Sequence, residues 1–186
     1  MRIFATIALV IAAAPATNAA ETFFAIYIAE RNGVRPCYAR TYDAKHLAAH
    51  PQQKVEHFFV IRSDGDQGKP PKTFDLSFGF RLKESSDSFS SLAGCAAKGD
   101  GATCSVEGDG GHFRLTPRPD GLLVTVVDYL AIEGTESFSP NLAESDDRAF
   151  RLYPAAAPEC SYGWGGDHPG GGTVLEPLTP SISRPE

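Results

Sequence analysis

FDLSFGFRLK (residues 74–83) shows the clearest periodicity in the chain. Apolar residues occupy every second position, and polar or small residues occupy the positions between them. Strict alternation of this kind is typical of a β-strand with one buried face. The predicted buried face consists of Phe74, Leu76, Phe78, Phe80 and Leu82.

Similar short runs lie on both sides of this strand. VEHFFVIR (55–62) is rich in β-branched and aromatic residues, and TFFAIYIA (22–29) is more continuously apolar. Further strands are predicted at residues 103–108, 112–117, 122–133 and 149–154. Turn signals rich in Gly, Asp and Pro separate these runs, and PRPDGLL (117–123) is the best hairpin signal. The pattern indicates an all-β fold, a small antiparallel barrel or sandwich.

One short helix is predicted at YDAKHLAAHP (42–51). Asp43 is a good N-cap, and Pro51 ends the helix near Ala49 because the residue before a proline disfavours helical geometry. The spacing of His46 and His50 places both on one helical face, close to Asp43. These three residues are the candidate metal ligands. We favour a surface helix with capping and hydrogen-bonding histidines, because Asp43 is used as the cap and Pro51 draws His50 away from His46.

The chain contains four cysteines. An even number in an exported protein indicates disulfides, and four cysteines allow three pairings. We favour Cys95–Cys104, which flank a turn-rich stretch, and Cys37–Cys160, which tie the start of the domain to its end. Metal ligation is the alternative, but it needs close C-x-x-C pairs, and the sequence has none.

The ends of the chain differ from its middle. Residues 1–20 have one arginine, a short apolar stretch and small residues near the end, the layout of a secretory signal peptide. We therefore predict a signal peptide (1–20), one β-rich domain (21–160), and a disordered tail rich in Gly and Pro (161–186), with no transmembrane segment in the mature chain. Trp164 lies in this tail. It is either a docking anchor for a partner, or it folds back onto the domain or has no role, and we favour the second alternative.

Motifs for catalysis are few. The sequence has no G-x-S-x-G, no S-x-x-K and no H-E-x-x-H, because Leu47 follows His46. Residues 64–68 begin like a calcium-binding EF-hand loop, but Gly68 and Asp75 stand where that motif needs other ligands, so we favour a plain turn. The formal charge of −6 without a basic run argues against nucleic acid.

We predict a non-enzymatic periplasmic or secreted domain, without cofactor or resident metal, that binds an unknown protein or small ligand. The alternative is a secreted hydrolase or metal-binding protein with a dispersed site near His46, His50 and His57. CYARTYDAKHLAAHPQQKV, CSVEGDGGHFRL and DDRAFRLYPAAAPEC resemble segments of a family of small exported bacterial proteins of uncharacterised function. The resemblance implies a secreted single domain with the two bridges given above. It does not indicate any activity.

Overall fold

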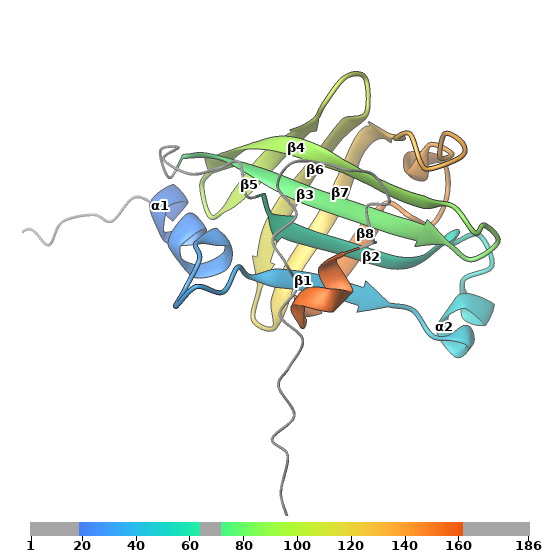
Figure 1. Cartoon of the computed structure of the whole chain (residues 1–186), viewed down its shortest axis with the longest axis horizontal. Helices are drawn as coiled ribbons and strands as arrows, with labels where there is room; N and C mark the ends of the chain where they lie inside the picture. The colour runs from blue at the N-terminus through green and yellow to red at the C-terminus, as the bar shows by residue number, and fades with distance from the viewer. Residues whose placement is uncertain (1–18, 64–71, 162–186) are drawn as a thin grey trace, which may run out of the picture.

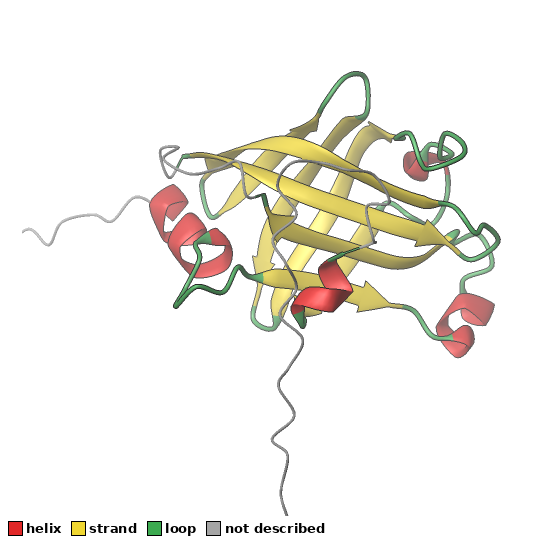
Figure 2. Ribbon diagram, viewed as in Figure 1, coloured by secondary structure: helices red, strands yellow, loops and turns green. Residues whose placement is uncertain are grey.

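Eight antiparallel strands form a closed barrel in the computed structural model, which describes residues 19–63 and 72–161 (Figures 1 and 2). Each strand pairs with the next one along the chain, and β1 pairs with β8 to close the barrel. The all-β prediction is confirmed, with a barrel instead of a sandwich. The strands are β1 (Cys37–Thr41), β2 (Val55–Arg62), β3 (Thr73–Leu82), β4 (Ser88–Lys98), β5 (Gly101–Val106), β6 (Gly111–Arg118), β7 (Gly121–Leu130) and β8 (Ala149–Pro154).

Aromatic rings fill the barrel interior. Strand β3 alternates as predicted, so its apolar residues point inward and Phe78 and Phe80 are fully buried. The ring of Phe58 lies 4.3 Å from that of Phe150, and the ring of Phe78 lies 5.2 Å from that of Phe113, measured between centroids. Where these rings meet, the interior of the barrel is therefore a packed core and not a ligand-binding cavity.

Strands β1 and β4 were not predicted. In β4, the residues facing the interior beyond Phe89 are small, and the pairing with β3 explains why. Phe78 lies opposite Ser91, and Phe74 lies opposite Cys95. A large residue on β3 thus packs beside a small one on β4, and together they fill the interior. Because these β4 residues are small, the strand lacks the apolar alternation that would have identified it in the sequence.

The prediction of a strand at residues 22–29 is wrong. This segment forms the helix α1 (Ala19–Phe23) and a π-helical turn, η1 (Phe24–Ile28), at one end of the barrel (Figure 1). Phe23 stacks on Tyr27 four residues later, with ring centroids 5.5 Å apart, and Phe24 lies 5.6 Å from Phe74. A short, continuously apolar run fits a strand or a buried helix equally well, and the barrel is already closed without another strand.

Both predicted disulfides are confirmed. Cys95–Cys104 joins β4 to β5 inside the barrel, and Cys37–Cys160 joins β1 to the 3₁₀ turn η4 (Ala157–Cys160). This turn packs on the outer face of β1 and β2, where Cys160 contacts a small apolar cluster that includes Phe59. The second bridge therefore clamps the end of the domain onto its first strand.

Several predictions concern residues outside the described part of the chain. These are residues 1–18 of the predicted signal peptide, the EF-hand-like stretch 64–68, and the tail from residue 162, which carries Trp164. Among the residues that the structure describes, no helix combines the length and apolar character needed to cross a bilayer.

Candidate functional site

The predicted short helix is present as α2 (Ala44–Ala49). Asp43 is its N-cap, since a side-chain oxygen accepts a hydrogen bond of 2.7 Å from the backbone N–H of His46. One detail differs from the prediction. Pro51 does not separate the two histidines, because the N–H of His50 still donates to the carbonyls of His46 and Leu47 and the side chain remains over the preceding turn.

The His46 and His50 rings stack face to face with centroids 4.4 Å apart. The ring planes are inclined by 28°, so the rings meet face to face, and their nitrogen lone pairs, which lie in the ring planes, do not converge on a common atom. Nε2 of His46 is also bonded to the side-chain oxygen of Gln53 at 2.9 Å. Within residues 19–63 and 72–161, no three His, Cys, Asp or Glu side chains are grouped so that they could hold a metal ion. The geometry gives the Asp43, His46 and His50 set no support as a metal centre.

His57 has a structural role in β2. Its Nε2 lies 2.9 Å from the carbonyl of Glu159 and its Nδ1 lies 2.8 Å from the Thr41 hydroxyl. A carbonyl only accepts, so Nε2 carries the proton and Nδ1 accepts from Thr41. Burial lowers the pKa of His57, which keeps the ring neutral. Nε2 thus holds η4 on the barrel wall and Nδ1 joins β2 to Thr41 of β1, so neither nitrogen is directed to a site shared with His46 and His50.

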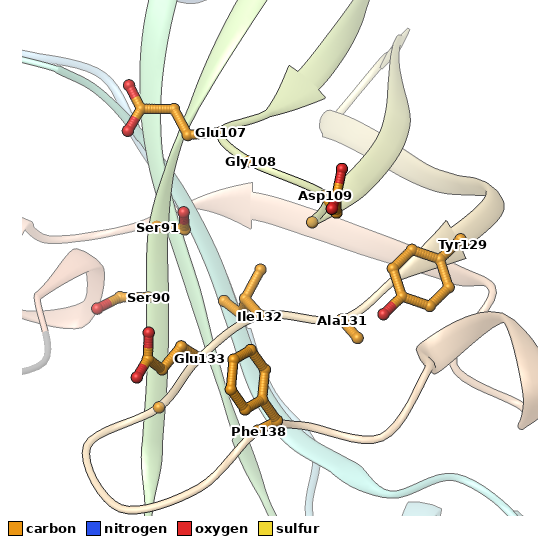
Figure 3. Close-up of a pocket in the computed structure, with 12 residues that line it drawn as sticks. Ser90, Ser91, Glu107, Gly108, Asp109, Tyr129, Ala131, Ile132, Glu133 and Phe138 are labelled. Atoms are coloured by element: carbon orange, nitrogen blue, oxygen red, sulfur yellow. The ribbon is translucent and has the colours of Figure 1, made fainter.

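A different set of side chains meets in a cleft of about 650 Å³ at the barrel rim (Figure 3). Three segments build it: β4, the turn between β5 and β6, and the end of β7 with the chain that follows it. Ala131 and Ile132 are buried beneath it and form an apolar floor. The residues around this floor are Ser90, Ser91, Glu107, Gly108, Asp109, Gly110, Tyr129, Glu133, Gly134 and Phe138.

A small hairpin forms one wall of the cleft. Glu133 pairs with Phe138 across it, and Gly134 pairs with Phe89 of β4. The hairpin approaches β4 so closely that a Cβ on Gly134 would lie 2.7 Å from the Phe89 ring. Only glycine fits there without displacing the ring, so this contact sets how closely the hairpin approaches β4.

Asp87 holds the tip of this hairpin. The residue is 3% exposed, and its carboxylate accepts hydrogen bonds from the backbone N–H groups of Thr135, Glu136 and Ser137. The hydroxyls of Thr135 and Ser137 also donate to it. These bonds, that from the Thr135 hydroxyl above all, hold the pKa of Asp87 well below its usual range. The hairpin is thus a fixed wall, and its cleft-lining residues need little ordering before a ligand binds.

An irregularity in β7 supplies the opposite wall. Gly111 pairs with Leu130 but the next residue, His112, pairs with Val127, so Asp128 and Tyr129 form a bulge. Gly111 has φ +98, and a Cβ there would lie 2.1 Å from the Tyr129 carbonyl oxygen. The bulge turns Tyr129 outward to the cleft, where its side chain is 44% exposed.

The cleft is acidic and aromatic together. Glu107, Asp109 and Glu133 contribute three carboxylates, and no lysine or arginine is among the described residues that line it. Phe138 is 74% exposed, more than any other large hydrophobic residue in the described chain. Figure 3 shows its ring beside Glu133 and Ile132, with Glu107 and Asp109 on the far side of the cleft. Such a site offers a cation both ion pairs and ring faces.

The sequence analysis missed these residues. It placed a turn between the predicted strands 103–108 and 112–117 and treated residues 122–133 as one strand, although the polar pair Asp128–Tyr129 interrupts the alternation there. That interruption was the one available signal of the bulge. No protein-family model matches the chain, and neither a curated protein nor a solved structure matches it.

Proposed function

We propose that this chain is an exported, non-enzymatic binding domain, and that the acidic-aromatic cleft is its binding site. The pattern of residues 1–20 and the two disulfides support export to an oxidising compartment. The observation that carries the binding proposal is the grouping of three carboxylates with the exposed rings of Tyr129 and Phe138 around one cleft.

The proposed occupant is an arginine-bearing segment of a partner protein. A guanidinium can form paired hydrogen bonds with a carboxylate and stack its plane on an aromatic ring, so it uses both features of the cleft. The open form of the cleft and the ring of Phe138 at its edge suit a protein surface, in which aromatic anchors supply much of the binding energy. The net charge of −6 adds attraction at longer range.

The test is a titration of isotope-labelled protein with a short acetylated peptide that carries one arginine between phenylalanine and glycine, followed by NMR. The expected result is saturable shifts at the amides of Tyr129, Glu133 and Phe138, weakening as salt is added. The matched peptide carries citrulline, which keeps the shape of arginine and removes its charge. Equal binding of both peptides would refute the proposal.

Variants then locate the interaction. Glu133→Gln and Phe138→Ala are each expected to weaken binding about ten-fold, the effect of losing one charge-assisted bond or one aromatic anchor. Glu136→Gln is the control, because it removes the same charge from the same hairpin at a residue that does not line the cleft. Binding of free arginine amide as tight as that of the peptide would instead make the occupant a small organic cation and overturn the protein partner.

A further inference from the structure

A second pocket, of about 410 Å³, lies on the other side of the β7 bulge. Arg114 of β6, Thr125 of β7 and Arg148 just before β8 line it, and so do Asp128 and Ala143. Asp128 is adjacent in sequence to Tyr129, so the same bulge exposes one residue to each pocket. The two pockets share no lining residue.

Arg114 and Arg148 differ from other arginines of the barrel. Arg151 pairs with Asp120 at 2.7 Å, and Arg81 pairs with Glu56 at 3.4 Å. Within the described part of the chain, the guanidinium groups of Arg114 and Arg148 make no ion pair, hydrogen bond or ring contact, although Asp128 lines the same pocket. In a chain with a net charge of −6, two cations that face one pocket without a counter-ion are available to a ligand.

The strand register brings these groups to one place. Arg114 pairs with Thr125, and Thr125 pairs with Ala149, the residue after Arg148. The backbone N–H of Val126 also donates to the carbonyl of Arg148 at 2.9 Å. Neighbouring strands are about 4.8 Å apart, so the backbones that carry the two arginines are roughly 10 Å apart, with Thr125 between them. Two extended arginine side chains are long enough for both guanidinium groups to reach one ligand over Thr125.

We propose that this pocket binds a phosphate group. Two guanidinium forks match the oxygens of a phosphate, and the Thr125 hydroxyl between them is a further donor. The carboxylate of Asp128 repels the same ligand and limits its affinity. A soluble phosphorylated molecule and a lipid headgroup both present this group, and the chemistry of recognition is the same for the two.

The test is a calorimetric and NMR titration of the whole mature chain with inorganic phosphate. Saturable binding with shifts at Thr125 and Val127 is expected, and Arg114→Gln and Arg148→Gln should each weaken it about ten-fold or more. Arg118→Gln is the matched control, because it removes one exposed arginine of the same strand that lies outside the pocket. Equal loss in all three variants, or shifts that do not saturate, would refute the proposal.

Asp128→Asn adds a variant that is expected to bind phosphate more tightly, whereas the arginine variants should bind it more weakly. Asp128 has φ +62, a conformation that asparagine adopts as readily as aspartate, so the fold should be retained while the repelling charge is lost. Phosphate is expected to bind several-fold more tightly to this variant, and weaker binding would contradict the proposed role of the pocket. A second experiment uses phosphatidylcholine vesicles that contain phosphatidate. If the protein binds these vesicles and inorganic phosphate competes with that binding, the ligand is a lipid headgroup. If the protein binds inorganic phosphate but not the vesicles, the ligand is a soluble phosphorylated molecule.

Discussion

The seam at which β1 pairs with β8 is the shortest strand pairing of the barrel, and we expect the Cys37–Cys160 disulfide to reinforce it. Only two residue pairs join these strands, Tyr38 with Pro154 and Ala39 with Tyr153, whereas β3 and β4 share nine. Pro154 has no N–H to donate. The informative perturbation is to replace Cys37 and Cys160 together with alanine and to compare this variant with the corresponding double replacement of Cys95 and Cys104.

The expected magnitudes follow from the lengths of the closed loops. The sequence separations are 123 and 9 residues. On the chain-entropy model, the long bridge contributes about 4.9 kcal/mol at 25 °C and the short one about 2.6 kcal/mol. All four cysteines are buried, so the loss of packing is similar in both variants and largely cancels in the comparison. The variant without the long bridge should therefore be less stable by roughly 2 kcal/mol.

Urea unfolding followed by far-ultraviolet circular dichroism, under non-reducing conditions, gives the free energy of unfolding of each variant. Hydrogen exchange adds a local readout. The amide of Ala155, which donates to the carbonyl of Cys37 at 2.9 Å, should lose protection first when the long bridge is absent. If the two variants lose equal stability, or if Ala155 stays as protected as in the wild type, the long bridge does not act as a clamp on this seam.

Three further predictions test the core, the C-terminal contact and the cleft wall. Phe58→Ala, which removes a fully buried ring that stacks on Phe150, should lower the free energy of unfolding by about 3–5 kcal/mol in urea titration, and a loss below 1 kcal/mol would argue against a packed interior. Burial holds the pKa of His57 below its unfolded value of about 6.5, so the unfolded chain takes up the proton first. Stability should be complete above about pH 6.5 and decline as the pH falls below it, and His57→Gln should flatten this part of the profile; an unchanged profile would remove His57 as its cause. Asp87→Asn should speed amide exchange at Thr135 and Ser137 and weaken binding of the arginine peptide, whereas unchanged exchange would show that the hairpin does not depend on this carboxylate.

The parts of the fold that follow from local pattern could be predicted from the sequence. The alternation of β3, the hairpin whose turn is Pro119–Asp120, the N-cap at Asp43 and the disulfide pairing are all confirmed. Each depends on residues close together in the chain or, for the cysteines, on few possible pairings. Strand β4 was missed because its inward residues complement the large side chains of β3, and such complementarity is visible only when the partner strand is known.

The helix at Ala19–Ile28 could not be distinguished from a strand for a related reason. Its apolar residues are continuous, and whether they cover a barrel end or join a sheet depends on whether a strand edge is open to them. The cleft is harder still to predict, because its carboxylates and rings come from segments up to 31 residues apart in the chain, from Glu107 to Phe138. Only the barrel closure and the bulge at Asp128–Tyr129 bring them to one rim.

The packed interior decides where binding can occur in this barrel. With rings such as Phe58, Phe78 and Phe113 in contact across the middle, the described core leaves no room for a ligand at that level, and recognition must use the rim and outer surface. The bulge in β7 is one of two register irregularities in the described strands, and it is the one that lies between the cleft and the pocket lined by Arg114 and Arg148. It costs two ladder positions and requires Gly111 at a positive φ, and it exposes Tyr129 to the acidic-aromatic cleft and Asp128 to the arginine pocket. A regular β7 would lack both exposures, which is why we expect function to be concentrated on either side of this bulge.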